Sequence, residues 1–154
     1  MIPCVYIKFA KFFNCHLREE ERLMLHLLVA PSSTSSRKAC QWLTEHHLEF
    51  AERDIYRRPL HADEIKQILC LSENGCEEIV ATRSNAYKRV KTDLDAMPLS
   101  QFIDVLTKHP EMLKRPILFN DEKLLVGFND EEIRNFLPRE LRKRNLETLL
   151  KKSS

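Results

Sequence analysis

The stretch PSSTSSR, residues 31–37, places two serines three positions apart where a helix is expected to begin. A loop of this outline, with a proline before it and Arg37-Lys38 after it, is one in which thiols are expected at both serine positions. Two thiols there could form a redox-active disulfide, because a thiolate attacks its partner sulfur. Ser33 and Ser36 cannot couple in this way, since a hydroxyl does not ionise near neutral pH. The loop therefore has the layout of a redox site without its chemistry.

The residues around this loop offer no partner that would turn either serine into a nucleophile. A serine nucleophile needs an adjacent general base, and the nearest histidine, His26, belongs to the preceding apolar run. The backbone N–H groups of residues 33–36, at a helix N-terminus beside Arg37 and Lys38, instead predict a natural anion site. The five cysteines form no CxxC pair and have no metal-ligand spacing with histidine, so neither a metal nor a cofactor is predicted.

The elements that must position this loop follow from hydrophobic spacing. Residues 25–30, LHLLVA, predict a buried strand, and residues 49–55 predict a second strand. Between them a helix is expected from residue 34 or 35, with a buried stripe at Ala39, Trp42, Leu43 and His46. Because a crossover helix joins the two strands, they should be parallel.

An all-helical insert is expected over about residues 56–110. Its first helix has Ile65, Ile68 and Leu69 on one face, and Asn74-Gly75 marks a break before short helical pieces over 76–90. Its last helix is predicted from the i, i+3, i+4, i+7 spacing of Leu99, Phe102, Ile103 and Leu106.

The chain then returns to strands. Residues 115–128 predict a hairpin turning at Asn120-Asp121, and Asn129 with Glu132 predicts a capped helix. The basic tail, residues 138–154, is expected to be helical with a stripe of leucines at positions 141, 146, 149 and 150. The order predicts an α/β, thioredoxin-like domain over residues 24–137, with a four-stranded mixed sheet, flanking helices and a helical insertion.

The length and charge of the chain limit the kinds of partner that it could bind. The 154 residues suit one domain, and the net charge of +2 conceals two basic zones, at 82–91 and 138–154. Each zone is either a solvated helical face or a surface for a polyanion or an acidic protein. An odd number of cysteines fits a reducing cytoplasm.

The first 23 residues are too short and too charged to span a membrane and make a poor signal peptide. Arg18 to Arg22, Arg-Glu-Glu-Glu-Arg, corresponds to purine-rich codons like a ribosome-binding site. One interpretation is therefore an untranslated leader with Met24 as the true start. The other is a disordered or loosely docked extension.

Several segments together resemble a known family. APSSTSSRKACQWL, EIKQIL, NGCEEIVATRS, AMPLSQFIDVLTKHPEMLKRPILF and LLVGFNDEEIRNFLPR, in this order and spacing, are similar to the Spx regulators, in the ArsC-like (arsenate reductase) branch of the thioredoxin fold. The resemblance covers Met24 to about Arg144.

The resemblance implies a transcriptional regulator and not an enzyme. Such proteins bind the C-terminal domain of the RNA polymerase α subunit and engage promoter DNA with it during stress, and the unbound chain is expected to be a cytoplasmic monomer. The sensor CxxC of the family corresponds to Ser33 and Ser36, so this redox switch is lost. Arg115 corresponds to the arginine beside the sensor.

The same resemblance supplies candidate contacts. Gly75 corresponds to a glycine used at the polymerase, and Arg83, Lys88 and Arg89 are candidates for contacts with phosphates or acidic patches. We expect Arg115 to hydrogen-bond loop carbonyls or the serine hydroxyls, and the Arg115–Pro116 peptide to be cis.

Three alternatives stay open. The serines could be natural or could be engineered replacements in an ordinary Spx, and the sequence reads the same either way. An ArsC-like reductase remnant could use another thiol, of which Cys40 is the nearest to the loop. A small interaction module without a DNA role is the third possibility.

Overall fold

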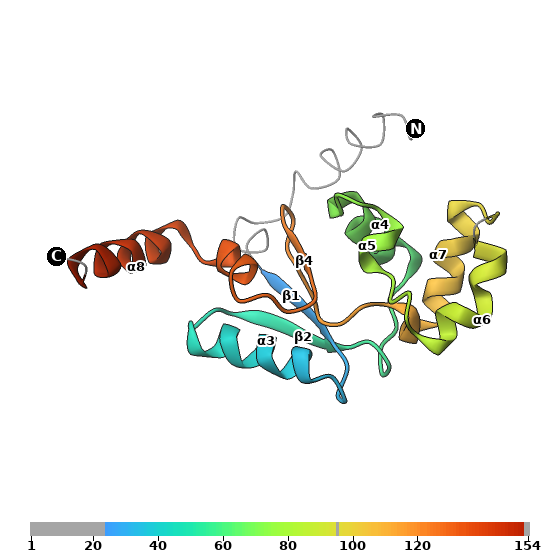
Figure 1. The fold of residues 1–154 in the computed structure, drawn as a ribbon, viewed down its shortest axis with the longest axis horizontal. Helices are drawn as coiled ribbons and strands as arrows, with labels where there is room; N and C mark the ends of the chain where they lie inside the picture. Colours follow the sequence, from blue (N-terminus) through green and yellow to red (C-terminus); the bar gives the residue numbers. More distant parts are fainter. Residues whose placement is uncertain (1–23, 95, 153–154) are drawn as a thin grey trace.

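The computed structural model describes residues 24–94 and 96–152 (Figure 1). The interpretations of residues 1–23 as an untranslated leader or an extension lie outside the described residues. A four-stranded sheet in the order β2-β1-β3-β4 forms the centre of the domain. β1 pairs with β2 in parallel and with β3 in antiparallel, and β3 pairs with β4 in antiparallel. The mixed, thioredoxin-like sheet predicted from the sequence is confirmed.

The first unit consists of β1 (Leu25–Val29), α3 (Thr34–Glu45) and β2 (Phe50–Asp54). Side chains alternate across β1, so Leu25, Leu27 and Val29 face α3 while Leu28 faces the opposite side. The stripe predicted on α3 is buried at Ala39, Trp42 and Leu43. His46 is only half-buried and stacks on the Trp42 ring at 3.8 Å, where the helix ends.

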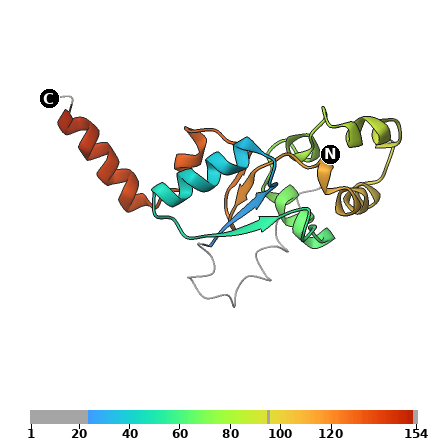
Figure 2. The same ribbon diagram turned by 90° about the horizontal axis from the view of Figure 1, so that it is seen from below.

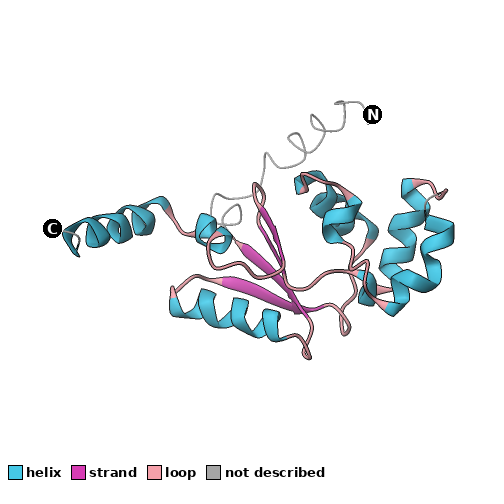
Figure 3. Ribbon diagram, in the orientation of Figure 1, coloured by secondary structure: helices cyan, strands magenta, loops and turns pink. Residues whose placement is uncertain are grey.

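The insert is helical, as predicted (Figures 1 and 3). It comprises α4 (Ala62–Leu71), α5 (Cys76–Ile79), α6 (Asn85–Leu94), α7 (Leu99–Lys108) and the 3₁₀ turn η1 (Pro110–Met112). A single bridge between Val80 and Leu113 ties the middle of the insert to the segment that leads back to the sheet. Hydrogen bonds from Ala81 N to Met112 O, at 2.7 Å, and from Lys114 N to Ile79 O, at 2.8 Å, flank this bridge.

The hairpin β3 (Ile117–Phe119) and β4 (Leu124–Val126) turns at Asn120, whose side-chain oxygen accepts the N–H groups of Glu122 and Lys123. The side-chain oxygen of Asn129 accepts the N–H of Glu131 at 2.9 Å, but the predicted capping box is not formed, because the Asn129 side-chain amide, and not its backbone N–H, donates to Glu132 at 3.1 Å. The turn it begins, η2 (Glu132–Phe136), is a 3₁₀ helix because Leu137 and Pro138 end it after five residues.

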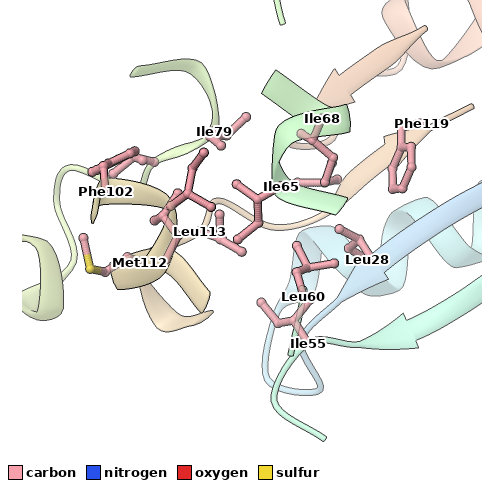
Figure 4. Packing of buried hydrophobic residues seen from close by; sticks show 14 of the residues in the cluster. Leu28, Ile55, Leu60, Ile65, Ile68, Ile79, Phe102, Met112, Leu113 and Phe119 are labelled. Carbon is pink, nitrogen blue, oxygen red and sulfur yellow. The ribbon is translucent and has the colours of Figure 1, made fainter. Parts of the chain in front are cut away.

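Two hydrophobic clusters cover the two faces of the sheet. One joins Leu28 and Phe119 of the sheet to α4, α5, α6 and α7, and Figure 4 shows Ile65 and Ile68 of α4 packed between the strands and the rest of the insert. The other joins the opposite face of the sheet to α3 and η2 and contains Trp42. Each helical layer is therefore fixed to its own face of one sheet.

The C-terminal helix α8 (Arg139–Lys152) confirms the predicted helical tail but not a buried leucine stripe. It extends away from the body of the domain (Figures 1 and 2). None of its described residues is fully buried. Leu141 packs partly against the Trp42 cluster, whereas Leu146, Leu149 and Leu150 are about 60% exposed (58%, 63% and 59%).

Candidate functional site

The serine loop begins α3. Ser33 is its N-cap residue, with extended backbone (φ −86°, ψ 117°), and its hydroxyl oxygen accepts the N–H of Ser36 at 3.2 Å. This bond satisfies one of the donors that the first turn of a helix leaves unpaired. Ser33 therefore has a structural role that needs no thiol.

Ser36 lies deeper. Only 3% of its surface is exposed, and its hydroxyl oxygen accepts the N–H of Ala30 at 3.4 Å. This contact joins the first turn of α3 to the end of β1. Both serines of the loop are thus held in hydrogen bonds with backbone groups. The cation nearest in sequence, Arg37, donates to the Thr34 hydroxyl at 3.3 Å.

Arg115 lies at the same end of the sheet but has a different partner from the one predicted. Its guanidinium donates to the Tyr56 hydroxyl and lies 5.6 Å from the centre of the Tyr56 ring. The expected bond to loop carbonyls or serine hydroxyls is not found among the described residues. The Arg115–Pro116 peptide is cis, as predicted. Sequence reasoning missed Tyr56, although its place two residues after β2 puts it at the end of the sheet where Arg115 enters β3.

Cys40 is the thiol nearest to the loop in sequence, and its environment disfavours the thiolate. Burial, and then the nearby Glu52 carboxylate, raise the pKa of the Cys40 thiol to about 11. The sulfur lies 3.5 Å from Glu52 Oε2. Because the thiolate is the nucleophile, this cysteine is poorly suited to begin a reductase reaction at neutral pH.

In the insert, Gly75 occupies a turn that a side chain would disturb. Its φ of +65° and ψ of −139° form a backbone conformation that glycine adopts far more easily than other residues. A Cβ atom built on Gly75 would meet nothing within 4 Å. Glu78 holds the turn by accepting the N–H groups of Glu73 and Asn74, at 2.9 and 3.1 Å. The backbone at Gly75 is therefore rigidly presented and open to approach.

The basic candidates of the insert lie on and just before α6. The side chains of Arg83, Lys88 and Arg89 are exposed, and none of the three has a carboxylate partner among the described residues. Ser84 begins α6 by accepting the N–H of Tyr87 at 3.0 Å, which fixes Arg83 just before the helix. The structure thus brings the three cations to one segment, while Ser33 and Ser36 lie apart from them at the sheet.

Neither a metal centre nor a membrane span appears in the part of the chain that the structure describes. No group of three or more histidine, cysteine, aspartate or glutamate side chains there could hold a metal ion. No described helix is long and apolar enough to cross a bilayer.

The sequence matches a known protein family and several known proteins. The sequence pattern of the ArsC family matches residues 28–136. The chain is 46% identical over 119 residues to the global transcriptional regulator Spx of Listeria monocytogenes, covering 77% of this chain and 91% of that protein. It is 46% identical over 123 residues to Spx of Enterococcus faecalis, covering 80% and 93%, and 45% identical over 119 residues to Spx of Bacillus subtilis, covering 77% and 91%.

Solved structures agree on the fold. A putative ArsC family related protein from Bacteroides fragilis superposes with a TM-score of 0.67 at 26% identity, covering 73% of this chain and 97% of that one. A possible arsenate reductase from Streptococcus mutans superposes with a TM-score of 0.63 at 23% identity, covering 71% and 97%. With its mixed sheet, helical insert and extended similarity to the Spx proteins, the chain belongs to the ArsC family and, within it, to the Spx group of global transcriptional regulators.

Proposed function

We propose that this regulator binds the C-terminal domain of the RNA polymerase α subunit and helps it engage promoter DNA in a stress response. The observation that carries the proposal is the Gly75 turn, a rigid, uncovered piece of backbone in the same insert as the exposed cations of α6. A partner can approach such a turn closely because no side chain intervenes. Arg83, Lys88 and Arg89 then supply charge for phosphates or acidic side chains.

The proposal includes the loss of thiol control. Ser33 and Ser36 occupy the sensor positions and are held by hydrogen bonds to backbone N–H groups. Since neither can form a disulfide, oxidants should not act through this loop. The protein would work in the cytoplasm as a monomer until it meets the polymerase, and its output would follow its abundance.

A non-enzymatic role also fits the chemistry of the described residues. A reductase remnant would need a thiolate, and the raised pKa of Cys40 keeps that thiol protonated at neutral pH. Ser33 has no hydrogen bond to a histidine among the described residues, and its hydroxyl instead accepts a bond from Ser36 N. No cofactor is required by this proposal.

Binding of the full chain to the isolated α C-terminal domain, with and without the thiol oxidant diamide, tests the proposal. We expect binding whose affinity is the same in both conditions. Absence of binding would refute the polymerase assignment. Oxidant-dependent binding would instead refute the loss of thiol control.

The Gly75 turn can be tested separately, since the chain contains a matched control. Gly127 also has a positive φ, +84°, and also has open space where a Cβ would lie. Gly75→Ala and Gly127→Ala should each cost about 1–2 kcal/mol of folding free energy from backbone strain. Both variants should lose folding stability, but only Gly75→Ala should also weaken binding to the polymerase. If the two variants bind the polymerase equally well, Gly75 is not part of the interface.

A further inference from the structure

Three loops meet at the end of the sheet where β1 and β2 finish. Ile55, directly after β2, donates its N–H to Val29 O at the end of β1, at 3.1 Å. β3 begins at Ile117 opposite Leu28, so the segment that enters β3 arrives at the same end. Figure 1 shows the loops after β1 and β2 together at this end of the sheet. Residues distant in sequence therefore share one edge of the molecule.

These loops carry an excess of positive charge. We use the term basic edge for Arg37 and Lys38 at the start of α3, Arg57 and Arg58 after β2, and Arg115 before β3. All are exposed except Arg115, which is partly exposed. Within the described part of the chain, Arg57 is the only member with a carboxylate partner, Asp54, at 3.6 Å.

The carboxylates near the basic edge are already paired. Asp54 accepts the N–H of Tyr56 at 2.8 Å in addition to its contact with Arg57. At the start of α4, Glu64 pairs with Arg53, and Asp63 pairs with Lys66 at 3.4 Å. Five cations and the single carboxylate Asp54 leave the basic edge with a formal charge of +4.

Tyr56 adds an aromatic group to this charge. Tyr56 is 42% exposed. Its hydroxyl accepts a hydrogen bond from the Arg115 guanidinium, which also lies over its ring. Arginines with fixed orientation contact phosphate oxygens well, and an exposed aromatic ring can pack on a sugar or a base. Among the residues that the structure describes, Tyr56 is also the only large hydrophobic one exposed at the basic edge. Protein interfaces have an apolar core depleted of charge, so this surface fits a polyanion better than a protein partner.

We propose that the basic edge binds the sugar-phosphate backbone of double-stranded DNA. This inference rests on the proposed function for the presence of a promoter, and it adds a second DNA-contacting surface to Arg83 and α6. The bridge between Val80 and Leu113 links the two surfaces, because Arg83 follows it on one segment and Arg115 follows it on the other. The contacts would be to phosphates, so they position the duplex without reading its sequence.

The double variant Arg57→Ala/Arg58→Ala tests the proposal. Binding of the full chain to a fluorescent DNA duplex is measured between 50 and 200 mM salt, alone and with the polymerase α C-terminal domain. Each lost phosphate contact reduces the salt slope of log K by about 0.9, so a reduction of about 1.8 is expected. Affinity near 100 mM salt should fall on the order of tenfold or more.

Lys151→Ala/Lys152→Ala is the matched control, because it removes two exposed cations from the far end of α8. A slope change confined to Arg57→Ala/Arg58→Ala supports the proposal. An equal change in both variants would show a net-charge effect and overturn it. Weaker binding of Arg57→Ala/Arg58→Ala to the polymerase domain without DNA would make the edge a protein surface instead. If the unmodified chain does not bind the polymerase domain, the proposed function is wrong. The titration with DNA alone still tests whether the basic edge binds DNA.

Discussion

The hydroxyl of Ser33 accepts the N–H of Ser36, and the hydroxyl of Ser36 accepts the N–H of Ala30. Serine is among the preferred N-cap residues, and a cysteine sulfur is a much weaker acceptor. The two serines thus suit the start of α3 better than two reduced cysteines would. The sequence alone predicted their chemical inertness but not these bonds, because a bond to Ala30 depends on how the loop turns back onto β1.

A substitution at the cap gives a direct measure of its contribution. Ser33→Ala should lower the free energy of unfolding by about 1 kcal/mol, because the N–H of Ser36 loses its acceptor. Ser35→Ala, in the exposed first turn of the same helix, should change it little. Urea unfolding of the two variants gives the comparison, and equal losses would contradict the assigned cap.

The thiol of Cys40 should respond to its neighbouring carboxylate. Burial and Glu52 raise its pKa to about 11, so Glu52→Gln should lower this pKa and speed alkylation of Cys40 at pH 8. Mass spectrometry of iodoacetamide-treated protein measures the rate site by site. Glu45→Gln, at the end of the same helix, should leave the rate unchanged, and a similar acceleration in both variants would disprove the local effect.

Arg83 is the cation for which the sequence made the sharpest prediction. It is exposed and fixed just before α6, so Arg83→Glu should weaken promoter complexes with the polymerase without altering the fold. Arg134→Glu, an equal charge reversal at an exposed side chain of η2, serves as control. Gel-shift titration of both variants, with circular dichroism to check folding, measures the effect. Normal promoter complexes with Arg83→Glu would remove this residue from the site.

At the scale of elements, the long periodic segments were predictable and the short ones were not. α3 and α4 carry a clear apolar stripe, α3 begins at Thr34 as predicted, and α4 contains the predicted stripe. α5 has only four residues, and its existence depends on Gly75 and on the Glu78 side chain that closes the turn. The exposure of α8 was also beyond sequence reasoning, since leucine spacing shows a stripe but not whether anything covers it.

An ion pair between Arg53 and Glu64 links β2 to α4. Arg53 pairs with Glu64 and also donates to the carbonyls of Arg58 and Pro59, at 2.9 and 2.6 Å. Desolvation works to raise the pKa of Glu64, but hydrogen bonds from Arg53 and the N–H of His61, with the Arg53 charge, together lower it. The folded state therefore favours the charged carboxylate.

This lowered pKa fixes the sign of a pH effect. A carboxyl whose pKa is lower in the folded state adds stability above its unfolded value, here 4.5, and loses it as the pH falls through the folded pKa. Glu64→Gln should thus destabilise the protein at pH 7 and have little effect well below pH 4. Asp63→Asn, at the more exposed pair with Lys66, should show a smaller difference. Urea unfolding at several pH values measures both, and a pH-independent loss in Glu64→Gln would contradict the ion pair.

At the scale of the whole molecule, one sheet separates two hydrophobic clusters, and β3 contributes to both. Ile117 and Phe119 belong to the insert side, and Leu118 belongs to the α3 side. The overall architecture was predictable because each strand and crossover helix obeys a general rule of connection. The gathering of basic side chains from three loops was not, since it depends on which loop ends share an edge of the sheet.

The shared sheet predicts a single unfolding transition. The only tryptophan in the chain, Trp42, reports on the α3 side alone. Ile68→Ala, on the insert side, should cost about 2–5 kcal/mol and shift the midpoint seen by Trp42 fluorescence as much as that seen by circular dichroism. An unshifted fluorescence midpoint would mean that the insert unfolds by itself.

The insert joins the sheet through only two stretches of chain, residues 55–61 and 113–116, and both arrive where α3 begins. A force applied to the insert would therefore reach the sheet through these two stretches and through the packing of α4 against Leu28 and Phe119. None of the cysteines in the described part of the chain forms a disulfide. Reducing conditions should therefore leave the attachment of the insert to the sheet unchanged.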